Sequence, residues 1–156
     1  MDAQAEINLL GHKLFEQVDR IFACVDGASD DELNWRPTSE NTNTLAVLAT
    51  HIMGNLQQNI FVVLLGGEDH RDRDAEFQVE GASAAILMQQ WTDLRSRIEG
   101  ALNTMPGDIL DREYDHPRRG RSSGRELLLN AALHAAEHAG HAELTRDLIK
   151  AQGQGG

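Results

Sequence analysis

The amino-acid sequence predicts an all-α protein, an antiparallel bundle of four helices in one domain. Four long segments place apolar residues at steps of three and four, as amphipathic helices do, and no segment alternates convincingly as a strand would. Aromatic residues are only 4% of the 156 residues, so the core must be built mainly from aliphatic side chains and methionine. That composition suits packed helices better than a β-sandwich.

The first helix is expected over residues 3–26 and is followed by a short helical turn. Gly27 ends the apolar periodicity, and Ser29 with Glu32 forms a capping box for the turn. Pro37 prevents a continuous helix through this stretch. The apolar stripe of the first helix consists of Ile7, Leu10, Leu14, Val18, Ile21 and Val25.

The second helix is expected over residues 43–65. The loop 38–44 before it is rich in side chains that cap helices, and Gly66 with Gly67 ends it. A charged loop, 68–76, follows. Loops of this length often line a functional site.

The third helix has the cleanest periodicity, and Pro106 with Gly107 closes it. Residues 107–122 contain many charges, one proline and one further glycine after Gly107, so we expect an irregular loop. The third stripe consists of Ala84, Leu87, Trp91, Leu94, Ile98, Ala101 and Met105.

The fourth helix is expected from the capping box of Ser123 and Glu126 to about Ala151. The domain therefore covers residues 1–151, and the glycine-rich tail 152–156 is expected to be disordered.

The charge and the cysteine content narrow the partners and the compartment. A formal net charge of −11 argues against nucleic-acid binding, because an acidic chain repels phosphate. The single cysteine, Cys24, cannot form an internal disulfide and lies among apolar residues, which indicates a core position and a reducing compartment. The N-terminus does not resemble a signal peptide, and no apolar run is long enough to cross a membrane. We therefore expect a cytoplasmic protein.

Histidines on the fourth helix are the strongest functional signal. His134, His138 and His141 lie within about 60° of one another on the helical wheel and share the apolar stripe that should face the interior. Two histidines four residues apart on an inward face can converge on one metal ion. The axial rise between His134 and His141 is too great for one ion, so the spacing leaves two candidate pairs, 134/138 and 138/141.

A third ligand must come from another helix. His51 lies on a core-like stripe of the second helix, whereas His12, His70 and His116 are expected to be exposed. Three neutral imidazoles with open positions form a catalytic type of site. Two asparagines, each one turn from a candidate ligand, are interpreted as orienting or substrate-contacting residues or as polar residues at the mouth of the bundle: Asn55 and Asn130.

The stretch from His134 to His138 also matches the H-x-x-E-H pattern of inverzincin metalloproteases. Those enzymes need a further glutamate far downstream, and Glu143 is the only glutamate after His138. We interpret the match as accidental for a protease. Glu137 is retained as a candidate general base, with a solvent-facing residue as the alternative.

Nearly the whole chain resembles the DinB/YfiT superfamily of bacterial metal-binding four-helix proteins. The resemblance is carried by residues 33–37 (Leu-Asn-Trp-Arg-Pro), by the sequence around His51, and by the stretch from His134 to His141. It implies an up-down-down-up bundle, a metal site of His51, His134 and His138, and His141 beside that site. It further implies frequent homodimers, a divalent ion such as nickel, zinc, iron or manganese, and a possible thiol S-transferase activity, since some relatives use bacillithiol, mycothiol or glutathione.

Four functional hypotheses follow. The first is an enzyme in which the metal binds a low-molecular-weight thiol that attacks a small electrophile, with Arg118, Arg119 or Arg121 holding the carboxylates of the thiol. The alternative for this arginine cluster, which also includes Arg125, is a solvated loop. The second is a metal-assisted hydrolase with Glu137 as base. The third is a non-catalytic, stress-related metal-binding bundle, and the fourth is a bundle whose histidines only form hydrogen bonds.

Overall fold

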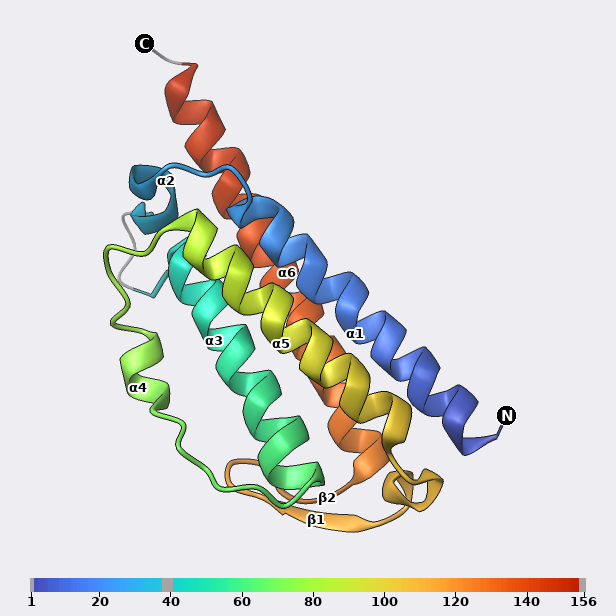
Figure 1. Ribbon diagram of the computed structural model, residues 1–156. Coiled ribbons are helices and arrows are strands. Elements are labelled where there is room, and N and C mark those ends of the chain that lie inside the picture. Colours follow the sequence, from blue (N-terminus) through green and yellow to red (C-terminus); the bar gives the residue numbers. More distant parts are fainter. Residues whose placement is uncertain (1, 38–40, 155–156) are drawn as a thin grey trace.

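A computed structural model describes residues 2–37 and 41–154, and Figure 1 shows how the helices are arranged. The long helices lie side by side: α1 (Ala3–Val25), α3 (Leu45–Gln57), α5 (Ala84–Thr104) and α6 (Gly124–Gly153). Helix α1 packs against each of the other three, and α3 contacts both α5 and α6. The described chain is therefore mostly helical, as predicted. The prediction of an all-α protein needs one correction, because the chain also forms a small two-stranded sheet.

The predicted helix boundaries around α1 and α2 agree with the structure. Gly27 follows α1 with a φ of 72°, a left-handed conformation that glycine adopts more easily than other residues. Helix α2 (Asp30–Asn34) begins with the expected capping box: the Ser29 hydroxyl accepts from the Glu32 N–H, and the Glu32 carboxylate accepts from the Ser29 N–H. Of the predicted capping loop 38–44, residues 38–40 lie outside the described part of the chain.

The second predicted helix, 43–65, consists of two elements. Helix α3 begins after Thr44, whose hydroxyl accepts from the Val47 N–H at 3.1 Å. The π-helix η1 (Gln58–Leu64) continues it. π-Helical turns are rare and frequently occur at functional sites.

The charged segment after η1 is more ordered than a solvated loop. It contains the short helix α4 (Arg73–Glu76), which begins at Asp72, where the carboxylate accepts from the Ala75 N–H at 3.0 Å. Helix α4 packs against α3, and this contact buries the side chain of Glu76. The segment therefore carries a charged group into the interior.

The prediction of an irregular loop over residues 107–122 is wrong. This segment forms the 3-10 helix η2 (Gly107–Leu110) and a hairpin of β1 (Glu113–His116) and β2 (Gly120–Ser123). A three-residue turn joins the strands, and Gly120 follows it with a φ of 73°, as expected for a turn that ends in a left-handed residue. The strands are only four residues long and mostly polar, so they show no alternating apolar pattern.

Helix α6 starts at the predicted capping box and continues past its predicted end. The Ser123 hydroxyl accepts from the Glu126 N–H, and the Glu126 carboxylate accepts from the Ser123 N–H at 2.8 Å. The helix extends to Gly153, so the first residues of the predicted disordered tail are helical. Gly155 and Gly156 lie outside the described residues.

The interior is aliphatic over most of its length, and its buried polar side chains are concentrated along α3 and η1. Within the described residues, the helices contribute fully buried side chains such as Leu14, Ile52, Ile98 and Ala135. None of the described helices is long and apolar enough to cross a membrane. The buried polar side chains of α3, η1 and α4 are His51, Asn55, Gln58, Asn59 and Glu76.

Candidate metal centre

Three imidazoles meet where α6 faces α3. His134 and His138 lie one turn apart on α6, and His51 lies on α3. One nitrogen from each ring lies within 4.8 Å of the other two. Nε2 of His51 is 3.2 Å from Nε2 of His134, and the ring centroids of His134 and His138 are 4.3 Å apart. The three histidines predicted as ligands are therefore close enough to one another for a metal site.

Hydrogen bonds within the protein do not satisfy all the nitrogens of this cluster. Both ring nitrogens of His138 are buried, and neither has a hydrogen-bond partner among the described residues. A buried polar atom without a partner costs about 1–3 kcal/mol. A purely hydrogen-bonded cluster would carry this cost at His138, whereas a bound ion would give one of its nitrogens a partner.

Burial also keeps two of these imidazoles in the form that binds metals. Burial, together with the smaller effect of neighbouring histidines, lowers the pKa of His134 to about 4 and the pKa of His138 to about 3. Both rings are therefore neutral at pH 7. A neutral imidazole offers a lone pair to a metal ion without first losing a proton.

The separation of one pair of these nitrogens matches that of two ligands on one divalent ion. Imidazole nitrogens bind zinc at about 2.0–2.1 Å, so two ligands at tetrahedral positions are about 3.3 Å apart. The 3.2 Å between the Nε2 atoms of His51 and His134 agrees with this separation. Three protein ligands would leave a coordination position open for a substrate, as in catalytic sites.

The second nitrogen of His51 contacts a buried ion pair. Nδ1 of His51 lies 2.8 Å from Oε2 of Glu76, and Arg71 donates from Nε to Oε1 at 2.7 Å and from Nη2 to Oε2 at 2.9 Å. Burial by itself would raise the pKa of Glu76, but the hydrogen bonds from Arg71 and His51 outweigh it and hold the pKa below its ordinary value. Glu76 is therefore an ionised carboxylate in contact with the cluster.

Sequence reasoning missed both Glu76 and Arg71, because they lie in a segment that was predicted to be a charged loop. A helix cap at Asp72 was the only local signal that this segment is structured. No spacing rule connects Glu76 with His51, which is 25 residues earlier and on another helix.

Three further predicted site residues lie near the cluster without a hydrogen bond to its rings among the described residues. Asn55 is buried, and its side-chain oxygen accepts from Asn59 Nδ2 at 3.1 Å. Asn130 is half-buried one turn before His134 on α6. His141 is exposed, and its ring centroid is 5.7 Å from that of His138, which places it beside the cluster.

Arg121 and Glu137 lie on the surface. Arg121 is exposed on the hairpin, where its Nε is 3.4 Å from a Glu113 carboxylate oxygen. Glu137 is exposed on α6, and no hydrogen bond or ion pair joins it to the three histidines in the described ranges. The predicted roles of Arg121 in substrate binding and of Glu137 as a base stay predictions.

The prediction that His116 is exposed is wrong. Only 5% of its surface is accessible, and its Nδ1 accepts from the backbone N–H groups of Arg118 and Arg119. Its burial follows from the hairpin, which was not predicted and which packs His116 close to η1. His12 and His70 are exposed, and Cys24 is buried, as predicted.

Three arginines add to the electrostatic effect on His134. After burial and the neighbouring His51, the charges of Arg119, Arg71 and Arg73 lower the pKa of His134 further. The guanidinium of Arg73 lies 4.7 Å above the ring of Phe77, whose centroid is 4.8 Å from that of His51. Neither Arg73 nor Arg119 forms an ion pair within residues 2–37 and 41–154.

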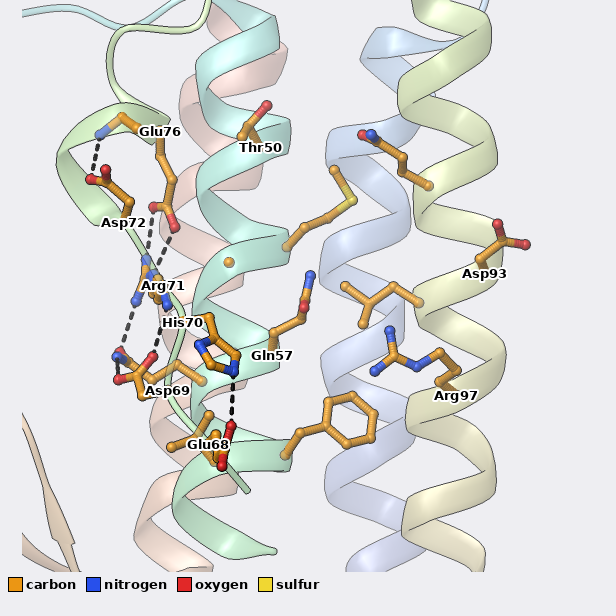
Figure 2. Close-up of a pocket in the computed structure, with 18 of the residues that line it drawn as sticks. Thr50, Gln57, Glu68, Asp69, His70, Arg71, Asp72, Glu76, Asp93 and Arg97 are labelled. Atoms are coloured by element: carbon orange, nitrogen blue, oxygen red, sulfur yellow. Dashed lines mark hydrogen bonds and ion pairs between the residues drawn. The ribbon is translucent and has the colours of Figure 1, made fainter. Parts of the chain in front are cut away.

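A groove of about 800 Å³ adjoins the cluster but does not include the three histidines (Figure 2). It lies between α3 and α5 and is partly covered by the segment before α4. Arg97 extends from α5 over the ring of Phe61, at 4.7 Å from the ring centroid. Arg71 and Glu76 form part of the groove wall, so these two residues lie between the groove and His51.

A family model described as mycothiol-S-transferase matches residues 9–151, which is most of the chain. This match confirms the resemblance to the DinB/YfiT superfamily.

A solved structure titled "Crystal structure of the conserved protein of locus from Enterococcus faecalis" is similar with a TM-score of 0.68 and 17% sequence identity. The similarity covers 92% of this chain and 96% of that chain. At this identity the likeness shows the shared fold alone. No curated protein matches the chain.

Proposed function

The chain belongs to the mycothiol-S-transferase family, and from this premise we propose that it is a metal-dependent enzyme that transfers a low-molecular-weight thiol to an electrophile. His51, His134 and His138 would hold one divalent ion. The observation that carries the proposal is the cluster itself: its nitrogens lie within 4.8 Å, and both nitrogens of His138 lack a protein partner among the described residues.

The proposed reaction joins a thiol sulfur to an electrophilic carbon. A bound divalent ion would lower the pKa of a thiol beside it, so that the thiolate is available at neutral pH. The thiol proton leaves to solvent, the new S–C bond forms, and the leaving group departs with the electron pair of the bond that breaks. The three histidines act by binding, since one nitrogen of each ring lies within 4.8 Å of the other two, and His134 and His138 stay neutral at pH 7.

The charges near His134 favour a substrate with an anionic group. Arg73 and Arg119 have no carboxylate partner within the described residues, and both lower the pKa of His134. Of the residues to which the sequence assigned an anion-binding role (Arg118, Arg119 or Arg121), we favour Arg119 and add Arg73, since Arg121 pairs with Glu113. Asn130 and His141 are retained as substrate contacts because they flank the ligands on α6.

A homodimer of up-down-down-up bundles is part of the proposal. Helix α6 exposes a stripe of large apolar side chains on the face away from the core, and such a stripe is suited to pairing with a second copy. The stripe consists of Leu129, Leu133, Leu144 and Leu148. The three imidazoles do not select among nickel, zinc, iron and manganese by themselves, because nitrogen ligands of this kind accept many divalent ions.

The test uses tag-free protein purified without a chelating resin. Metal content is measured by mass spectrometry, and conjugation of mycothiol, bacillithiol and glutathione to a chromogenic electrophile is then followed with and without added metal. We expect about one equivalent of a divalent ion, as three ligands to one ion require, and metal-dependent acceleration with at least one thiol. A fully loaded protein that accelerates none of these reactions would leave only a metal-binding bundle, and a protein that binds no added nickel or zinc would leave a hydrogen-bonded one.

A further inference from the structure

We propose that Glu76 is a positioning residue that holds the His51 ring with its proton on Nδ1 and its Nε2 lone pair facing His134 and His138. This inference rests on the proposed metal site and deepens it. It assigns a function to a segment between α3 and α5 that contributes no residue to the histidine cluster itself.

The contact between Glu76 and His51 determines which ring nitrogen carries the proton. Arg71 donates to both oxygens of Glu76, and a carboxylate paired in this way only accepts further hydrogen bonds. Nδ1 of His51 lies 2.8 Å from this acceptor and 3.4 Å from the donor Arg71 Nη2, so the shorter contact favours a proton on Nδ1. Nδ1 is then turned towards Glu76 and Nε2 towards the cluster, where it lies 3.2 Å from Nε2 of His134. Carboxylates that hold a metal-binding histidine in this way fix both its tautomer and its orientation.

Glu76 is itself held in place by a closed set of hydrogen bonds. Arg71 donates hydrogen bonds to both carboxylate oxygens of Glu76. It also donates from Nη1 to Oε1 of Gln58 at 3.0 Å. Gln58 donates to Oδ2 of Asp69 at 2.7 Å, and Oδ1 of Asp69 accepts from the backbone N–H of Arg71 at 3.0 Å. Figure 2 shows Arg71 between Glu76 and Asp69. This network leaves the carboxylate little freedom to turn away from His51.

Gly54 provides the space that the carboxylate needs. It lies on α3 three residues after His51, and a Cβ atom at this position would be 2.0 Å from Oε1 of Glu76 and 2.8 Å from its carboxyl carbon. Any other residue there would displace Glu76 or the helix. A glycine in the middle of α3, unfavourable for helix formation, is thereby explained by the approach of Glu76.

The first measurement needs no variant. Nitrogen-15 NMR of the metal-free wild-type protein distinguishes a histidine protonated on Nδ1 from one protonated on Nε2. We expect His51 to be protonated on Nδ1. A His51 ring protonated on Nε2 would overturn the inference, whether or not the protein binds a metal.

The second measurement is the affinity for Co²⁺, determined by competition with a chelator. In Glu76→Gln we expect the dissociation constant to rise about 10–100-fold, as for other outer partners of metal ligands. The matched control is Asp74→Asn, which removes an exposed carboxylate from the same short helix and should stay within about twofold of wild type.

Gly54→Ala tests the same contact without changing Glu76. Its added methyl group should weaken Co²⁺ binding and change the absorption spectrum of the bound ion. Gly100→Ala on α5 is the control, because a Cβ atom at this position would meet no neighbouring atom within 4 Å. If Gly54→Ala does not fold, the Co²⁺ affinity of Glu76→Gln and the His51 tautomer of the wild type still test the positioning role of Glu76.

The outcomes separate the two proposals. Wild-type protein that binds no Co²⁺ contradicts the proposed function, and the tautomer then decides the positioning role alone. Wild-type protein that binds Co²⁺, with Glu76→Gln binding it equally well, contradicts the positioning role and leaves the metal site intact.

Discussion

Two parts of the interior differ in whether their buried polar atoms have hydrogen-bond partners. Around Trp91, the indole stacks on Phe22 with ring centroids 5.2 Å apart, and its N–H donates to Asp19 at 2.9 Å. Around His138, three imidazoles pack edge to face, yet neither nitrogen of His138 has a hydrogen-bond partner in the described part of the chain.

The difference teaches how to separate a structural core from a binding site. A structural core satisfies its polar atoms within the protein, because an unsatisfied buried atom lowers stability. A site that binds a ligand keeps polar atoms available at that cost. The Trp91 region should therefore determine the stability of the fold, and the His138 region should determine what the protein binds.

The largest expected effect comes from removing His138, whose two ring nitrogens both lack a partner among the described residues. His138→Ala should abolish binding of a divalent ion, because it removes one of three ligands, while the metal-free protein still folds. Metal content by mass spectrometry and helicity by circular dichroism check both parts. His141→Ala is the control and should keep its metal, since His141 is exposed beside the cluster. Full metal content in His138→Ala would remove the distinction between the two regions.

The second prediction concerns the region around Trp91, where a substitution should change stability and leave metal binding intact. Trp91→Ala should lower the free energy of unfolding by about 3–5 kcal/mol, because it leaves a large cavity and removes one hydrogen-bond donor to Asp19. Urea unfolding measures this loss. Folded Trp91→Ala should bind Co²⁺ with wild-type affinity. A Co²⁺ affinity that falls along with stability would mean that the two regions are not independent.

Removing the ion from the histidine cluster should lower the stability of the folded protein by a smaller amount. An ion present at 100 times its dissociation constant stabilises the folded state by about 2.7 kcal/mol. For a chain of this size that corresponds to a rise in Tm of about 5–10 °C. Differential scanning calorimetry with and without chelator should show this shift in wild type and in Trp91→Ala. His138→Ala should show none, and a shift there would place the ion elsewhere.

The smallest effect concerns His116, a buried histidine outside the cluster. Burial, reinforced by nearby arginines, lowers its pKa, so the unfolded chain binds more protons than the folded one below about pH 6.5. Its contribution to stability is therefore present at neutral pH and lost as the pH falls from about 6.5 towards the folded pKa. His116→Asn keeps an acceptor for the N–H groups of Arg118 and Arg119 but cannot titrate.

Urea midpoints at pH 7 and pH 5 should therefore differ less in His116→Asn than in wild type, with unchanged Co²⁺ affinity at pH 7. Equal pH dependence in the two proteins would show that His116 is not protonated preferentially in the unfolded state. A changed Co²⁺ affinity would extend the metal centre to the hairpin.

The sequence by itself determined the long helices and the part of the candidate site that lies on α6. Apolar periodicity and the Ser29 and Ser123 capping boxes place helix boundaries, because these signals depend on hydrogen bonds between residues three or four apart. The same local geometry brings His134 and His138 together on one face of α6. His51 followed from its core-like stripe and from the family resemblance, and the structure confirms its proximity to the pair.

Only the tertiary structure decided the surroundings of that site. The approach of Glu76 to His51, the need for glycine at position 54 and the burial of His116 all depend on how α4 and the hairpin pack against α3 and η1. Such contacts join residues far apart in the chain and leave no periodic trace in the sequence. They form because a charged or polar side chain that is carried into the interior by a neighbouring helix must find a partner there.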